Sequence, residues 1–184
     1  MPVTIGAKRE SDFTDPLGML SDCHRRVERF LQALIEVTNQ AKGESFTTEQ
    51  KTAFENGLRY FKEAAPKHTA DEEESLFPRL RATRRPDMVQ FMERITVLER
   101  DHGTAAEAHR EVERLGRKWL RDGRLAEPDA ARLSEQLAKL AELYQRHIHL
   151  EDNEVFPAAA TILSADDRKV IGEEMAFRRG IGRG

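Results

Sequence analysis

The chain has 184 residues, which suffices for one domain that buries a core without disulfides and leaves no room for a second full domain. Its 33 acidic and 30 basic side chains are mixed along the sequence, a pattern that excludes the basic footprint of a nucleic-acid-binding protein. A single cysteine excludes an internal disulfide, the amino terminus lacks the apolar core of a signal peptide, and no apolar run approaches the roughly 18 residues of a membrane span. We therefore expect a soluble cytoplasmic protein with no membrane partner.

The first half of the chain predicts two helices. Asp15 followed by Pro16 marks the start of a helix that runs to about residue 41, with His24 in its apolar stripe. A second helix is expected to begin at Thr47 or Thr48 and to continue through residue 76. Pro66 lies inside this pattern and should kink or split the helix.

The second half predicts two more long helices and a short one. The third helix should start near Pro86, after the break at 84–87, and end at Gly123. The fourth starts after residues 127–129 and passes residue 151, and Ser164 caps a short helix that Gly180 stops. The predicted fold class is all-α, an up-down-up-down four-helix bundle with a short C-terminal helix. The expected organisation is an N-terminal arm (1–15), the bundle (16–163), and the C-terminal helix and tail (164–184).

A repeated motif points to the function. His147 is followed by Glu151 after four residues and by the Phe156-Pro157 pair after nine and ten, and the same spacing occurs 79 residues earlier in His68, Glu72 and Phe77-Pro78. Residues four apart on a helix project from one face, so each copy directs an imidazole and a carboxylate to the same point. The two Phe-Pro pairs are expected to end these helices and to cover the site.

Two further histidines complete the repeat. His24 and His102 are 78 residues apart, and each lies in the apolar stripe of the helix that precedes a His-x-x-x-Glu motif. The chain therefore has the pattern of two copies of a helical hairpin. Antiparallel packing of the hairpins would bring six side chains to one level of the core: His24, His68, Glu72, His102, His147 and Glu151.

Four imidazoles and two carboxylates in an apolar interior predict bound metal. Each buried polar group without a partner costs roughly 1–3 kcal/mol, and metal coordination removes this cost. Nitrogen and oxygen ligands without a thiolate suit iron, manganese or zinc. Two carboxylates for four histidines suggest two metal ions bridged by Glu72 and Glu151, with coordination positions left for an oxo or hydroxo bridge and for an exogenous ligand. The chemical alternative is a structural zinc site, although such sites favour four ligands that include thiolates.

These residues resemble the hemerythrin-like, or HHE cation-binding, domain family over about residues 16–180. The resemblance implies that the six residues hold a non-haem di-iron centre (Fe2+/Fe3+) with a bridging oxo or hydroxo oxygen. Oxygen-carrying hemerythrins have a fifth histidine where this chain has Ala106, and an aspartate that corresponds to Asp152. The symmetric set of four histidines and two glutamates is more similar to a bacterial group that includes proteins for repair of iron centres and for nitric oxide stress. Asp152 competes with Glu151 for the bridge, and the symmetry of the repeat favours Glu151.

The other polar residues near the motifs are expected to have mainly structural or surface roles. Tyr144, one turn before His147, either hydrogen-bonds a ligand or packs in the core, and His109 is a partly buried packing residue or a neighbour of the metal ligands. We expect a surface position for His149 and a buried structural thiol for Cys23. The run 71–74 is interpreted as a solvated acidic face apart from Glu72. The basic residues Arg178, Arg179 and Arg183 suit a helix C-terminus and tail.

The sequence supports two hypotheses about function. The first is a redox-active di-iron protein that binds or turns over a small diatomic or peroxide ligand such as O2, NO or H2O2, with the metal centre itself carrying the chemistry and an electron donor that the sequence does not identify. The second is a non-catalytic oxygen or redox sensor or an iron-handling module, in which metal occupancy changes the stability of the bundle and the binding of a partner.

Overall fold

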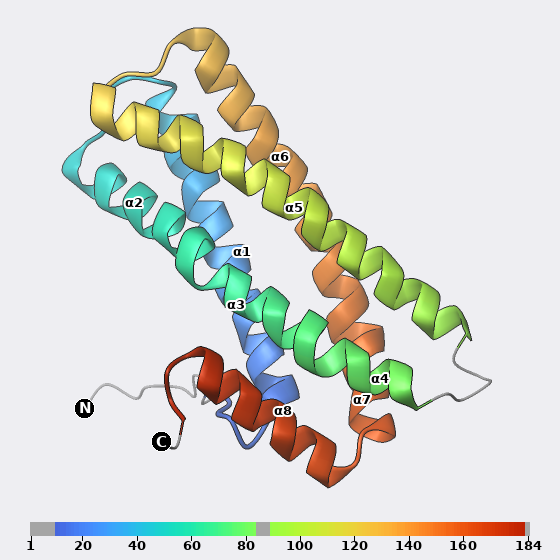
Figure 1. The fold of residues 1–184 in the computed structure, drawn as a ribbon. Helices are drawn as coiled ribbons and strands as arrows, with labels where there is room; N and C mark the ends of the chain where they lie inside the picture. The colour runs from blue at the N-terminus through green and yellow to red at the C-terminus, as the bar shows by residue number, and fades with distance from the viewer. Residues whose placement is uncertain (1–9, 84–88, 183–184) are drawn as a thin grey trace, which may run out of the picture.

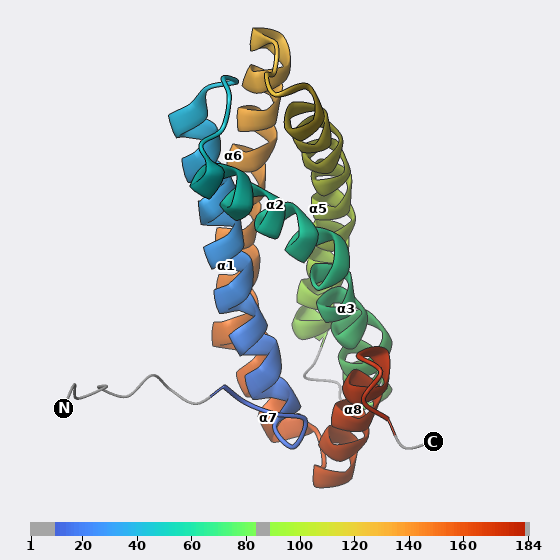
Figure 2. The ribbon, with the colours of Figure 1, turned by 90° about the vertical axis from the view of Figure 1, so that its left-hand side faces the viewer.

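The computed structural model describes residues 10–83 and 89–182, and all regular structure within these ranges is helical. Four long helical segments run up, down, up and down along one axis, and a short C-terminal helix crosses one end (Figures 1 and 2). The segments are α1 (Pro16–Ala41); α2 (Thr48–Glu63) with α3 (Ala65–Ala70), η1 (Asp71–Leu76) and α4 (Phe77–Ala82); α5 (Val89–Asp122); and α6 (Glu127–Leu150) with η3 (Glu151–Val155) and α7 (Phe156–Ile162). The crossing helix is α8 (Ala165–Arg178). The predicted all-α bundle is confirmed, and no described helix has the length and hydropathy of a membrane-spanning segment.

The predicted helix caps explain most of the boundaries. The carboxylate of Asp15 accepts from the backbone N–H of Gly18 at the start of α1, and Thr47 and Ser164 each form a capping box with the third residue of the helix that follows. Gly123 and Gly180 have φ angles of 74° and 71° where α5 and α8 end, as expected for glycine just past a helix. The predicted break at 84–87, the start near Pro86, and Arg183 lie outside the described residues.

The second helical segment is interrupted twice rather than once. The predicted break is present, because α2 ends at Glu63 and α3 begins at Ala65, immediately before Pro66. The prediction that the Phe-Pro pairs end their helices is wrong. At Phe77-Pro78 and Phe156-Pro157 the helix continues as α4 and α7, after one wider π-helical turn in η1 and η3. The wider turn accommodates a proline ring that would otherwise collide with the carbonyl four residues back.

Two apolar clusters fill the bundle, one on each side of the level where the six predicted residues lie. The distal core, on the side of the α5–α6 turn, is centred on Trp119 and Phe54, which are fully buried. The α8-side core includes Phe77, Ile95 and Met175, all of which are also fully buried. Polar groups between these two cores are therefore shielded from water along the bundle axis, which sets the environment of the site.

Helix α8 is fastened to η1 by a buried ion-pair cluster. Asp71 is 0% exposed, and its carboxylate accepts from Arg178 Nη1 at 3.0 Å and from Arg179 Nη2 at 2.6 Å. Burial raises the pKa of Asp71, and the two guanidinium groups oppose that shift. A second link joins Arg79 to Glu174 through two hydrogen bonds of 3.0 and 2.8 Å. The interpretation of 71–74 as a solvated face is therefore wrong for Asp71, because α8 covers this residue. The local sequence gives no sign of this distant contact.

This cluster predicts a stability effect. Replacing Arg178 and Arg179 together by alanine leaves the Asp71 carboxylate buried without a counter-charge, so we expect the free energy of unfolding to fall by about 3–5 kcal/mol in urea titrations. The matched control is the exposed pair Lys169 and Glu173, whose replacement by alanine should change stability by less than about 0.5 kcal/mol. Equal stability of the two double variants would contradict the assignment.

Candidate metal centre

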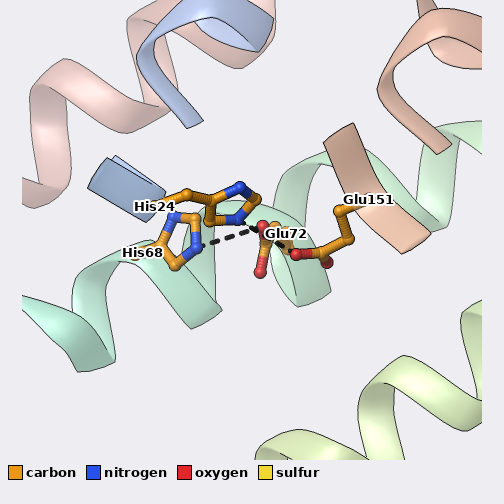
Figure 3. Close-up of side chains that lie close together, drawn as sticks. All are labelled: His24, His68, Glu72 and Glu151. Atoms are coloured by element: carbon orange, nitrogen blue, oxygen red, sulfur yellow. Dashed lines mark ion pairs between the residues drawn. The ribbon is translucent and has the colours of Figure 1, made fainter. Parts of the chain in front are cut away.

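The six predicted side chains converge between the two cores in two overlapping groups. One group contains His24, His68, Glu72 and Glu151, and the other contains the same two glutamates with His102 and His147. Within each group, one potential ligand atom per residue lies within 4.8 Å of all the others, so that each group could hold a metal ion. Figure 3 shows the first group, with the four side chains directed toward a common point. We call the six residues the His–Glu cluster.

Both glutamates connect the two groups. Glu72 lies with Oε1 at 3.3 Å from His68 Nε2 and with Oε2 at 3.2 Å from His102 Nε2. Glu151 lies with Oε2 at 3.1 Å from His24 Nε2 and 3.2 Å from His147 Nε2. Each carboxylate thus contacts two imidazoles, one from the first group and one from the second. The two carboxylates therefore belong to both groups.

The two π-helical turns position the glutamates. The N–H of Phe77 bonds the carbonyl of Glu72 and the N–H of Phe156 bonds that of Glu151, in each case five residues back. Wide turns of this kind are frequent at functional sites in helices. The shared spacing of His, Glu, Phe and Pro in the two copies of the motif therefore corresponds to a shared backbone irregularity as well as to shared side chains.

Two carboxylates outside the cluster orient its histidines. Glu73 Oε1 lies 2.8 Å from His102 Nδ1, and Asp152 Oδ1 lies 2.9 Å from His24 Nδ1. Each follows a cluster glutamate directly, and each contacts the histidine of the other repeat. A carboxylate that accepts from Nδ1–H leaves Nε2 free to ligate a metal, as in many metalloproteins. Sequence reasoning missed this role, although the equivalent places of Glu73 and Asp152 in the repeat could have indicated it.

The charges within the cluster are strongly coupled. Burial lowers the pKa of His24, but its contacts with Asp152 and Glu151 outweigh burial and raise it to about 10; similarly, Glu72 and Glu73 raise the pKa of His102 to about 9. Burial and the charge of Glu151 raise the pKa of Glu72 to about 7. Burial also raises the pKa of Glu151, but its two histidine partners reverse the shift and leave that pKa below the ordinary value. The carboxylates thus favour the charged forms of the His24 and His102 imidazoles, and these two rings oppose the cost of burying Glu72 and Glu151.

The donor set fits a bound cation. Both oxygens of Glu72 and of Glu151, and Nε2 of His24 and of His102, are buried and make no hydrogen bond of good geometry among the described residues, although the carboxylates and imidazoles approach one another to 3.1–3.3 Å. Buried polar atoms in that state cost free energy, and a bound cation removes this cost. The potential metal ligands in the cluster are nitrogen and oxygen atoms only. The buried thiol of Cys23 does not belong to any of the candidate metal-binding groups found among the described residues.

A cavity of about 350 Å³ adjoins the His–Glu cluster. Tyr144 and His109 line it, and the Tyr144 hydroxyl lies 2.9 Å from His109 Nε2. The ring of His109 stacks on Phe61 at a centroid distance of 4.2 Å. The structure thus gives Tyr144 both an aromatic environment and a hydrogen-bond partner outside the cluster. Ala106 also lines this cavity, one turn from His102, and His149 is exposed as predicted.

Comparison with known proteins agrees with this geometry. A family model described as the hemerythrin HHE cation binding domain matches residues 15–159, which include all six residues of the cluster. An uncharacterized protein of Haemophilus influenzae is 27% identical over 177 residues, and the alignment covers 92% of each chain.

The outer carboxylates generate a prediction about metal affinity. Asp152→Asn keeps the size of the side chain but removes the charge that orients His24, so we expect metal affinity to fall about 10- to 100-fold. Equilibrium titration against a competing chelator measures this change. The matched control is Glu154→Gln, which removes a carboxylate in the same turn that pairs with Arg94 at the surface, and it should leave affinity unchanged. An unaltered affinity in Asp152→Asn would show that His24 needs no such support.

His109 generates a prediction about acid sensitivity. Burial lowers its pKa from 6.5 to about 4, so the folded protein binds this proton less readily than the unfolded chain. The stability that a neutral His109 contributes is complete above pH 6.5 and is lost as the pH falls toward about 4. We therefore compare the free energy of unfolding of the metal-free parent and of metal-free His109→Gln by urea titration between pH 6.5 and about 4. Over this range the free energy of unfolding should fall by about 3 kcal/mol less in the variant than in the parent. Parallel stability curves would contradict this, and the exposed control His149→Gln should follow the parent.

Proposed function

The chain belongs to the hemerythrin HHE cation-binding domain family, and on that premise we propose that it is a non-haem di-iron protein that binds or reduces a small ligand such as O2, NO or H2O2. The observation that carries the proposal is the pair of four-residue groups that share Glu72 and Glu151. In this arrangement His24 and His68 would hold one iron, and His102 and His147 would hold the other. Glu72 and Glu151 would contribute to both sites.

The choice of iron rests on the donor chemistry and on the family resemblance together. Imidazole and carboxylate ligands suit iron, manganese and zinc alike, and a structural zinc site usually includes thiolates, which the cluster lacks. A bound iron pair would supply the electrons that reduction of O2, NO or H2O2 requires. With two histidines and two shared carboxylates, each ion would keep coordination positions for such a ligand.

The protein's own residues prepare the site in three ways. Glu73 and Asp152 fix the rings of His102 and His24 through their Nδ1 atoms. The two cores exclude water along the bundle axis, and the cavity beside the cluster admits a ligand from the side. The pair formed by Tyr144 and His109 lies on the wall of that cavity and can donate or accept a hydrogen bond there.

The second candidate function is a metal-dependent sensor or iron-handling module, and one contact favours it. Asp71, which holds Arg178 and Arg179 of the α8 end, directly precedes Glu72 in the same π-helical turn. A change in how Glu72 is coordinated would therefore reach α8 through a single peptide unit. Turnover separates the two functions, because an enzyme consumes many equivalents of H2O2 or NO after anaerobic reduction, whereas a sensor binds or reacts stoichiometrically.

Metal content tests the proposal. We expect about two irons per chain in protein produced with iron, with an optical absorption in the near ultraviolet after oxidation. His68→Ala and Glu151→Ala each remove a donor of the cluster and should lower the iron content by half or more. The control His149→Ala, at an exposed histidine two residues from His147, should bind iron like the parent. A parent that binds well under two irons per chain, or cluster variants that bind as much iron as the parent, would refute a di-iron site.

A further inference from the structure

The cavity beside the His–Glu cluster is much larger than a diatomic or peroxide ligand. Its volume is about 350 Å³, whereas a water-sized molecule occupies about 30 Å³ and an apolar cavity of about 150 Å³ already accepts benzene. The floor of the cavity is formed by the four cluster histidines. A small ligand at the metal centre would therefore leave most of the space empty. The cavity thus has room for a larger molecule.

The walls of the cavity are apolar. They extend from the cluster toward the distal core and are formed by Val27, Leu34, Leu58, Phe61 and Val112. All five of these side chains are buried, at 7% exposure or less. Apolar walls of this kind bind hydrocarbon groups and hold water poorly. They therefore favour an occupant with an apolar body.

The cavity opens to solvent between two helical segments. The exposed members of its lining, Lys62, Pro66, Ala106 and Arg110, come from α2, α3 and α5. The ammonium group of Lys62 pairs with Glu113 Oε1 at 2.9 Å and so spans this mouth from α2 to α5. Lys62 is 54% exposed, and an exposed ion pair contributes little to stability. The pair can separate to admit a molecule without unfolding either helix.

One polar pair interrupts the apolar wall. His109 uses Nε2 to contact the Tyr144 hydroxyl, and its Nδ1 is buried with no hydrogen-bond partner among the described residues. The other polar groups that face the cavity are the histidines of the floor, the half-buried Thr69 and the charged residues of the mouth. An oxygen atom on the occupant could therefore pair with His109 or lie at the floor, while the rest of the molecule contacts only hydrocarbon.

We propose that this cavity binds an organic molecule with an apolar body about the size of a substituted benzene and a single oxygen function, such as an alcohol or a hydroperoxide. The molecule enters between α2 and α5 past Lys62 and Glu113, and its body packs on the apolar wall. The proposal goes beyond the proposed function, because it adds an organic ligand to the small ligand of the metal centre. It rests on the proposed function only where the occupant meets the four histidines of the floor, which are the proposed metal ligands. The apolar walls are present whether or not metal is bound.

Binding of 2-phenylpropan-2-ol, followed by calorimetry on the iron-loaded and on the metal-free protein, tests the proposal. We expect saturable binding of one molecule per chain in at least the iron-loaded form. Ala106→Phe places a ring at the mouth and Ala105→Leu reduces the volume from the buried side of the same helix, so each should weaken binding at least tenfold. The matched control is Ala131→Phe, at an exposed alanine of α6 that does not line the cavity, and it should bind like the parent.

The possible outcomes separate this proposal from that of the di-iron site. Absence of saturable binding to the iron-loaded parent, or equal binding by the parent and by a correctly folded Ala106→Phe or Ala105→Leu, overturns the cavity proposal while iron content still supports the metal centre. Cavity-sensitive binding by a chain that does not load iron supports the cavity proposal and removes the proposed function. Circular dichroism of each variant establishes that it is folded, and Ala106 is exposed, so a substitution there is compatible with the fold.

Discussion

The structure depends on the burial of two carboxylates in the middle of a helical bundle. Glu72 and Glu151 are both 0% exposed, a position that is unfavourable for an anion without compensation. The surrounding arrangement provides that compensation: four imidazoles face the two carboxylates, two further carboxylates hold imidazole rings from behind, and apolar cores close both ends. A bound cation is the compensation that the family of this chain implies.

The duplication in the sequence explains how so many polar groups meet. Each repeat supplies a histidine, a His-x-x-x-Glu motif and a π-helical turn, and the carboxylate after each glutamate crosses to the histidine of the other repeat. The hairpins are therefore linked through reciprocal contacts at the site itself. Because the contacts are exchanged, neither hairpin contains a complete set, and the site exists only when both are packed together.

The helical bundle and the convergence of the six residues could be predicted, because both follow from spacing along the chain. Helical periodicity places His24 and His102 on apolar stripes, and repetition identifies the two motifs. The π-helical turns could not be predicted, since a Phe-Pro pair inside a helix is equally compatible with termination. The burial of Asp71 depends on arginines more than 100 residues later, and the cavity depends on how α2, α3 and α5 pack. Such features arise from tertiary contacts, about which local sequence carries little information.

The ion pairs of Asp71 also break the symmetry of the duplicated bundle. The position that corresponds to Asp71 in the second repeat is Leu150, which packs against the α8-side core. The two repeats offer the C-terminal helix different surfaces, and only the first carries a buried anion for its arginines. Ser75 and Arg79, which also bond α8, correspond to Glu154 and Ala158 in the second repeat. Docking on the other surface would bury Arg178 and Arg179 against a leucine without a counter-charge, which is unfavourable. Asp71 thus helps to direct the C-terminal helix to the first of the two repeats.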